Sequence, residues 1–267
     1  YPPHNVGGLG KHVTELVPAL AAEGVEVYLL TPRWAGGMGE EVVNEVAAGA
    51  DGTVCSPTHI YRVEPPSVDM PDFFTGTWRT NVSLEERARQ LAGTGGRFDL
   101  IHVHDWLVAF AGIGLKHAYK LPLLATIHAT EYGRGRGQVS GDLPRAIHNV
   151  EWWLTYEAWR VVCCSQFMAN EIHTAFQAPT DKVDVIPNGV GTARFDAISD
   201  VDLTAFRAQY AAPDEKIIFY VGRIVQEKGV HLLVQAMPRL LAQFPGARLV
   251  ITGTGGSLEQ VRRLASA

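Results

Sequence analysis

The stretch Asp99–Trp106 (DLIHVHDW) decides the fold class of this chain, because in it an apolar strand ends on polar residues. The sequence predicts a strand over Phe98–His104, a helix over Trp106–His117 and a second strand over Leu121–His128. Strands and helices alternate in this way along most of the chain, which is typical of an α/β protein with parallel sheets. Ligands of such folds bind at the carboxyl ends of the strands, where these polar residues lie.

The same alternation predicts two domains with a boundary near residues 190–196. Residues 1–190 are expected to form a Rossmann-like domain, whereas residues 191–267 have only two expected strands, too few for a stable doubly wound sheet. Residues 34–58 are expected to form a loop or an irregular hairpin. The other expected helices are 11–23, 84–91, 143–159, 166–176, 203–210, 230–244 and 258–265, and the other expected strands are 25–31, 59–63, 161–165, 183–186, 217–221 and 248–252.

The composition narrows the class of protein. Hydrophobic residues make up 46% of the 267 residues and charged ones 19%, as in ordinary globular proteins. The formal net charge of −5 gives no reason to expect nucleic acid or an anionic membrane as a partner. No apolar run has the length of a transmembrane helix. Cys55, Cys163 and Cys164 fit no disulfide framework and indicate a reducing compartment, so we expect a cytoplasmic protein.

Two motifs far apart in the chain indicate a site for a diphosphate. Gly7-Gly8-Leu9-Gly10 opens a helix and offers backbone amides to an anion. Downstream, Gly222-Arg223 closes a strand and Lys228 precedes the next helix, so that a guanidinium and an ammonium group lie five residues apart. The alternative interpretations are a tight turn for the glycines and a pair of solvated surface charges. Together the motifs favour a diphosphate held between two domains. A nucleotide diphosphate is the leaving group when a sugar is transferred from an activated donor.

Histidines and an aspartate end the two central strands. Side-chain alternation places His102 and His104 on one face of the strand and Asp105 on the other. A metal site would need a further ligand, which His128 could supply from the next strand. We favour a buried, hydrogen-bonded histidine beside an aspartate that faces the cleft, with His128 as a polar contact to a sugar. We therefore expect no metal.

Several other residues carry weaker signals. Arg134 and Arg136 lie in a glycine-rich loop and are equally consistent with an acidic ligand and with simple solvation. Trp152, Trp153 and Trp159 could stack on sugar faces, but packing in the core is the favoured interpretation.

Two loops are candidates for contact with the donor. Asn188 belongs to the turn Pro187–Val190, and Gly253 belongs to the glycine-rich segment Thr252–Gly256 after an expected strand of the second domain. A hinge turn and a plain strand-to-helix turn are the respective alternatives.

Taken together, these motifs resemble the retaining glycosyltransferases of the glycogen and starch synthase group, glycosyltransferase family 4. The matching stretches follow the order of the family: 1–10, 99–106, 126–128, 185–190 and 221–229. The resemblance implies the GT-B fold of two Rossmann-like domains, with the second incomplete here. It implies front-face transfer with retention at the anomeric carbon and no requirement for a metal.

The resemblance also assigns roles to residues. It implies that Gly7, Gly8 and Gly10 approach the donor diphosphate and sugar, and that Arg223 and Lys228 neutralise the departing diphosphate. Asp105 and His128 match the family's aspartate and histidine of the sugar site. Asn188, Gly222 and Gly253 are expected to complete the donor site.

The chain departs from the family's pattern at both ends. The family has a hydrophobic strand before the glycine motif, and two glutamates that hold the donor sugar and ribose in a region beyond Ala267. We therefore expect a chain truncated at both ends that is inactive and poorly stable by itself.

The complete parent is expected to transfer sugar, most readily glucose, from a nucleotide-diphosphate sugar to a glycan acceptor such as an α-glucan. The alternatives are a mannosyl- or sucrose-type transferase, a non-catalytic module that binds a nucleotide sugar or glycan, and, more distantly, a metal hydrolase built on His102, His104 and His128.

Overall fold

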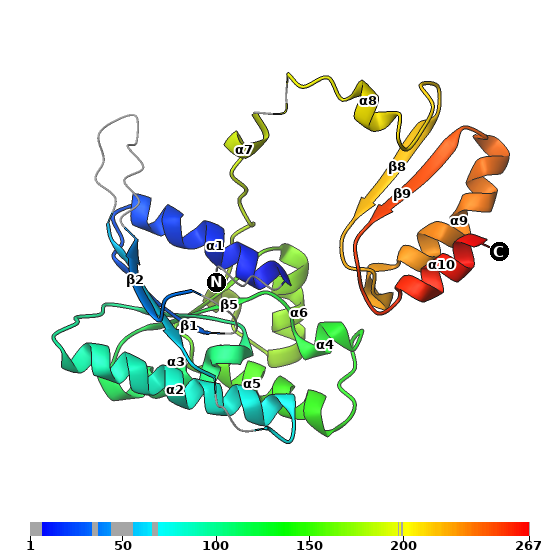
Figure 1. Ribbon diagram of the computed structural model, residues 1–267. Helices are drawn as coiled ribbons and strands as arrows, with labels where there is room; N and C mark the ends of the chain where they lie inside the picture. Colours follow the sequence, from blue (N-terminus) through cyan, green and yellow to red (C-terminus); the bar gives the residue numbers. More distant parts are fainter. Residues whose placement is uncertain are drawn as a thin grey trace. The chain divides into compact units, whose positions relative to one another are not determined.

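The computed structural model describes residues 7–33, 37–43, 56–65, 69–196, 198 and 200–266. The chain forms two compact units, Tyr1–Gly191 and Thr192–Ala267, and Figure 1 shows their helices and strands. The division falls after Gly191, one residue beyond the segment 187–190 in which a turn is expected. In the described part of the chain, no helix combines the length and the apolar character needed to cross a membrane.

The first unit contains two sheets, and all of its strand pairs except one are parallel. The larger sheet has the order β4-β5-β6-β7 and the smaller one β1-β3-β2, in which β2 is antiparallel to β3. The strands are β1 (Val27–Pro32), β2 (Glu40–Val43), β3 (Thr58–Val63), β4 (Ile101–His104), β5 (Leu123–Ile127), β6 (Arg160–Cys163) and β7 (Val183–Val185). Among the described residues, β1 pairs with β3 alone and β4 with β5 alone, so both are edge strands.

Six α-helices of the described part belong to this unit, and most of them correspond to helices expected from the sequence. They are α1 (Gly7–Ala22), α2 (Phe73–Gly93), α3 (Ala109–Tyr119), α4 (Glu131–Arg134), α5 (Asp142–Glu157) and α6 (Gln166–Phe176). A 3₁₀ turn, Trp106–Val108, precedes α3. Helix α6 has the predicted bounds because Ser165 caps it: its hydroxyl accepts a hydrogen bond from the Met168 amide at 3.2 Å.

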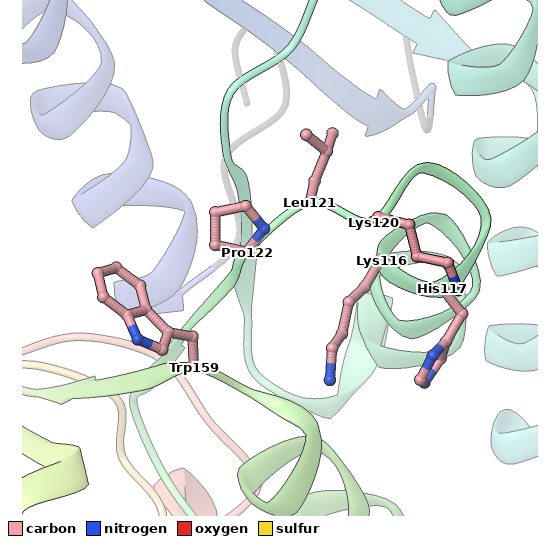
Figure 2. Close-up of a pocket in the computed structure, with 6 residues that line it drawn as sticks. All are labelled: Lys116, His117, Lys120, Leu121, Pro122 and Trp159. Atoms are coloured by element: carbon pink, nitrogen blue, oxygen red, sulfur yellow. The ribbon is translucent and has the colours of Figure 1, made fainter.

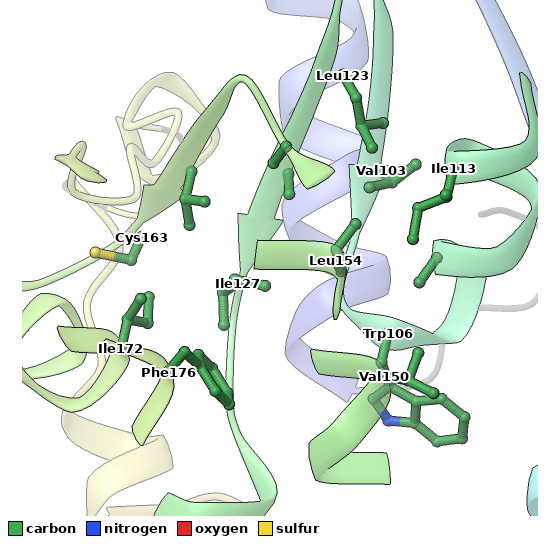
Figure 3. Packing of buried hydrophobic residues seen from close by; sticks show 14 of the residues in the cluster. Val103, Trp106, Ile113, Leu123, Ile127, Val150, Leu154, Cys163, Ile172 and Phe176 are labelled. Atoms are coloured by element: carbon green, nitrogen blue, oxygen red, sulfur yellow. The ribbon is translucent and has the colours of Figure 1, made fainter. Parts of the chain in front are cut away.

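The core of the first unit lies between its larger sheet and the helices that follow the strands (Figure 3). Leu123 and Val161 of the sheet, Leu154 of α5 and Ile172 of α6 are all completely buried. The run of apolar residues in β5 is typical of a parallel strand covered on both faces. This core fixes the positions of the β4 and β5 ends, from which the candidate site is built.

The structure corrects three details of the sequence-based expectations for this unit and, for segment 34–58, agrees with the hairpin alternative. Helix α2 begins at Phe73 rather than at 84, because Asp72 caps it by accepting the Thr75 amide at 2.8 Å. Strand β4 begins only at Ile101. Segment 34–58 contains β2, which makes it part of a hairpin with β3, although residues 34–36 and 44–55 lie outside the described residues. The loop 129–141 contains the single-turn helix α4.

The expectation that Trp152, Trp153 and Trp159 pack in the core is wrong. Trp152, Trp153 and Trp159 keep 47%, 36% and 66% of their surface exposed. The buried face of α5 instead comprises Ile147, Val150, Glu151, Leu154 and Thr155, at the spacing of one helix face. Trp152 and Trp153 fall beside that face, and Trp159 precedes strand β6.

The second unit has one two-stranded parallel sheet, as predicted, and two helices pack on it. Its elements are α7 (Ala193–Asp196), α8 (Thr204–Arg207), β8 (Lys216–Val221), the 3₁₀ turn Gln226–Lys228, α9 (Val230–Gln243), β9 (Ala247–Thr252) and α10 (Leu258–Ser266). Ile224, Val230, Val234 and Val261 form its small buried cluster. The helix expected over 203–210 is shorter than predicted: only the single turn α8, Thr204–Arg207, is helical.

Candidate functional site

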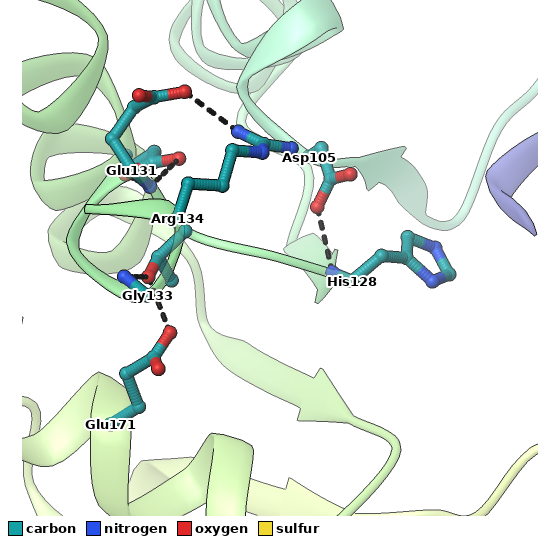
Figure 4. Close-up of polar contacts among 8 residues, drawn as sticks. Asp105, His128, Glu131, Gly133, Arg134 and Glu171 are labelled. Atoms are coloured by element: carbon teal, nitrogen blue, oxygen red, sulfur yellow. Dashed lines mark hydrogen bonds and ion pairs between the residues drawn. The ribbon is translucent and has the colours of Figure 1, made fainter. Parts of the chain in front are cut away.

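Asp105 joins the carboxyl ends of β4 and β5. Its Oδ1 accepts a hydrogen bond from the His128 amide at 2.7 Å, and its own amide donates to the Thr126 carbonyl at 2.9 Å (Figure 4). The side chain is buried rather than open to a cleft as expected, because the carboxylate turns toward the backbone of the neighbouring strand end. Burial raises the pKa of Asp105 to about 6, against the opposing effect of the hydrogen bond from His128.

The histidines of the two strand ends lie together, as predicted, and His12 of α1 joins them. His104 Nδ1 lies 3.1 Å from His128 Nε2, and the ring of His12 meets that of His128 edge-on at a centroid distance of 4.7 Å. His102 is engaged elsewhere, with Nε2 2.7 Å from Thr126 Oγ1. Burial lowers the pKa of His102 and of His128 to about 4 and that of His104 to about 2, so these imidazoles are neutral at pH 7.

His12 was not among the residues predicted from the sequence, and the metal-ligating set considered there, His102, His104 and His128, differs from the observed cluster in one member. In the described residues, the histidines whose ligand atoms cluster are His12, His104 and His128, not His102. A signal was available, since His12 lies in the first turns of the helix that the glycine motif opens, and that helix end was expected to face the ligand.

The glycine motif lies at the same end of the sheet as these histidines. Helix α1 begins at Gly7, and His12 is less than two turns further along it. Gly7 and Gly8 are exposed, and a Cβ built on either would meet nothing within 4 Å. Gly10 is buried. The backbone of Gly7 and Gly8 is therefore open to approach by a ligand.

Buried Glu151 and half-buried Glu171 hold the loop that follows His128. Both carboxyl oxygens of Glu151 accept from the Glu131 amide at 3.0 Å, while Thr130 caps α4 and is hydrogen-bonded to Glu171 (Figure 4). Arg134 pairs with Glu131 at 2.8 Å. Glu151 was not predicted from the sequence either. An acidic residue on the apolar face of α5 is unusual, and this position could have marked Glu151 as a functional or structural residue.

The protonation of Glu151 leads to a testable expectation about stability. Burial raises the pKa of Glu151 to about 8, so the folded first unit keeps a proton that the unfolded chain releases above its ordinary pKa of 4.5. The free energy of unfolding attributable to this group therefore falls as pH rises from 4.5 to 8, by at most about 1.4 kcal/mol per pH unit. We expect Glu151→Gln to remove this part of the pH dependence. The free energy of unfolding of the variant, relative to that of the wild type, should therefore be higher at pH 8 than at pH 5.

Denaturant unfolding of the first unit measures this effect. All six tryptophans precede residue 160, so tryptophan fluorescence follows the first unit alone. The matched control is Glu86→Gln, since Glu86 is exposed on α2. Equal pH dependence in the wild type and Glu151→Gln would show that Glu151 is ionised in the fold.

In the second unit, the candidate site consists of the two loops that follow β8 and β9, which are joined by backbone hydrogen bonds. The Gly222 amide donates to the Thr252 carbonyl at 3.0 Å, and the Ile224 amide to the Thr254 carbonyl at 2.8 Å. These bonds place Arg223 and Gly253 together beyond the carboxyl ends of β8 and β9, with Lys228 in the 3₁₀ turn that follows. Arg223 pairs with Glu227 at 2.9 Å, and both side chains are 65% exposed.

The predicted site residues thus fall into two groups, one in each unit. Asp105, His128 and the glycine motif come together in the first unit, and exposed Asn188 follows β7 at the same edge of the sheet. Gly222, Arg223, Lys228 and Gly253 come together in the second.

A hollow elsewhere in the first unit is not part of this arrangement. It has a volume of about 470 Å³, and Figure 2 shows Leu121, Pro122 and Trp159 among the residues that line it. Leu121 and Pro122 precede β5, and Trp159 precedes β6, so the cavity lies at the amino ends of the strands. The candidate site lies at their carboxyl ends.

Comparison with known proteins gives matches over nearly the whole chain. The model of the family described as Glycosyltransferase Family 4 matches residues 6–194, and that of Glycosyl transferases group 1 matches residues 202–267. An uncharacterised glycosyltransferase of Methanocaldococcus jannaschii is 36% identical over 96% of this chain and 61% of its own length. A glycogen synthase of Mycobacterium tuberculosis is 37% identical over 96% of this chain and 60% of its own length.

A solved structure shows the same fold. The catalytic domain of starch synthase IV from Arabidopsis thaliana, bound to ADP and acarbose, superposes with a TM-score of 0.66 at 20% identity, over 98% of this chain and 68% of that one. The chain therefore has the α/β architecture of GT-B proteins. It spans about 60% of the length of the curated relatives named above.

Proposed function

Because the chain belongs to glycosyltransferase family 4, we propose that the complete protein transfers glucose from a nucleotide-diphosphate glucose to an α-glucan, with retention at the anomeric carbon. The choice of glucose and glucan is supported by the relative named glycogen synthase and by the starch synthase that was bound to ADP and acarbose. The partners are then a nucleotide-sugar donor and a glycan acceptor. The free thiols of Cys163 and Cys164 suit a cytoplasmic location.

The observation that carries the chemistry is the exposed cationic loop after β8. Arg223 and Lys228 lie beyond the carboxyl end of a parallel strand, where open α/β sheets bind their ligands. The Arg223 guanidinium is 65% exposed and has an exposed glutamate as its partner, so a diphosphate can replace that glutamate. Fixed positive charge at the departing diphosphate lowers the barrier for sugar transfer. Such electrostatic stabilisation is usually the largest catalytic contribution, and we assign it that role here.

In the first unit, we assign sugar binding to His128 and a positioning role to Asp105. The neutral imidazole of His128 can exchange hydrogen bonds with a sugar hydroxyl without introducing a charge. Asp105 Oδ1 accepts a hydrogen bond from the His128 amide at 2.7 Å and so fixes the backbone position from which the His128 side chain extends. The amides of Gly7, Gly8 and Gly10 are proposed to approach the donor diphosphate, and Asn188, Gly222 and Gly253 to complete its contacts.

This mechanism predicts that transfer continues in the presence of a chelator. The donor diphosphate is neutralised by Arg223 and Lys228, so no divalent ion is needed for that step. Transfer of radiolabelled glucose to glycogen, measured with and without EDTA, should proceed at the same rate within about twofold. Complete loss of transfer in EDTA, with recovery on addition of a divalent ion, would contradict the proposal. ADP-, UDP- and GDP-glucose and a GDP-mannose control identify the donor in the same assay.

A further inference from the structure

Three imidazoles from separate parts of the first unit meet at one point. His12 belongs to α1, His104 ends β4 and His128 follows β5, yet their ligand atoms all lie within 4.8 Å of one another. In tetrahedral zinc sites the metal–nitrogen distance is about 2.0–2.1 Å, which separates the ligand nitrogens by about 3.4 Å. The separation of 3.1 Å between His104 Nδ1 and His128 Nε2 is close to that value.

The protonation of these residues suits metal binding. A histidine coordinates a metal only through a ring nitrogen that carries no proton. In the contact between the rings of His104 and His128, one nitrogen carries a hydrogen and the other accepts it. Coordination through both nitrogens requires only that this proton move to the other nitrogen of its own ring.

The surroundings define which side chains take part. His102 lies beside His104, at a centroid distance of 4.4 Å, but its Nε2 is 2.7 Å from Thr126 Oγ1. Asp105 is committed through Oδ1 to the His128 amide. The set is therefore three uncharged nitrogen ligands, which suits Zn²⁺, Co²⁺ or Ni²⁺ better than Mg²⁺ or Ca²⁺. Three protein ligands leave a fourth coordination position for water or another small ligand.

We propose that His12, His104 and His128 bind one divalent transition-metal ion, and that the bound ion keeps the donor sugar from reaching His128. Binding rests on the geometry of the three imidazoles alone. Exclusion of the sugar also rests on the proposed function, in which His128 contacts the donor. The ion is thus an inhibitor rather than a cofactor, which is consistent with the expectation that transfer continues in EDTA.

Calorimetric titration of the complete protein with Zn²⁺, followed by Co²⁺, tests the binding. We expect one ion per chain, and at least about tenfold weaker binding in His12→Gln and in His128→Gln. The matched control is His117→Gln, because His117 is exposed and pairs with Glu157 at a distance of 3.0 Å; its affinity should equal that of the wild type. Circular dichroism establishes that each variant is folded. Zn²⁺ should raise the melting temperature, followed by tryptophan fluorescence, in the wild type and in His117→Gln but not in His12→Gln or His128→Gln.

Spectroscopy and kinetics separate the two parts of the proposal. Visible absorption of the Co²⁺ complex should indicate nitrogen ligation that disappears in His12→Gln. No binding, or binding that survives both histidine substitutions, overturns the site. If Zn²⁺ binds as described but leaves transfer unchanged, exclusion of the sugar is wrong. If Zn²⁺ binds and no nucleotide sugar supports transfer, the proposed function fails and the metal site stands.

Discussion

Arg223→Ala and Lys228→Ala are each expected to lower the turnover of the complete protein by about 10²–10³-fold, which corresponds to about 2.7–4 kcal/mol in the transition state. The loss arises because each substitution removes one fixed positive charge from the place where the diphosphate gains charge as it departs. Stability should change little, since Arg223 is 65% exposed and its partner Glu227 is equally exposed. Initial rates at saturating donor, together with melting temperatures, measure the two effects.

Arg239→Ala is the control for this pair, since it removes the same charge from an exposed position of α9 in the same unit. Its turnover should remain near that of the wild type, which would show that general charge is not the cause. Near-normal turnover of Arg223→Ala or Lys228→Ala at saturating donor would refute the assignment of the cationic loop.

Gly253→Ala is expected to unfold the second unit. A Cβ at Gly253 would lie 1.9 Å from the Gly222 carbonyl oxygen, and the backbone there has a φ of +155°, which alanine rarely adopts. The strained backbone costs about 1–3 kcal/mol, and the overlap costs about 1–3 kcal/mol more. The unit has little stability to lose, because its buried cluster consists of Ile224, Val230, Val234 and Val261 only, among the described residues.

Hydrogen exchange distinguishes the two units in this experiment. The amides of β8 and β9 should lose protection in Gly253→Ala, while tryptophan fluorescence, which follows the first unit, stays unchanged. Gly256→Ala is the matched control, because a Cβ at Gly256 meets nothing within 4 Å. Full protection of β9 in Gly253→Ala would mean that the two loops can separate without unfolding.

Much of the fold could be predicted because its signals are local. Strand β5 is apolar at every position except Thr126, and α6 combines helical periodicity with a serine that caps its first turn. Both elements can therefore be predicted without knowledge of any distant contact. Likewise, polar residues that follow neighbouring parallel strands must share one edge of the sheet. That rule predicts that His104, Asp105 and His128 lie together, because β4 and β5 are adjacent and parallel.

What the sequence by itself determined is therefore the α/β class, the order of its elements and the strand-end residues. Only the tertiary structure decided which helix face is buried, since the tryptophans of α5 are exposed while Glu151 is enclosed. It also brought His12 to His104 and His128, and Gly253 to Gly222. The physical reason is common to these cases: burial and contact depend on segments remote in the chain, about which local periodicity carries no information.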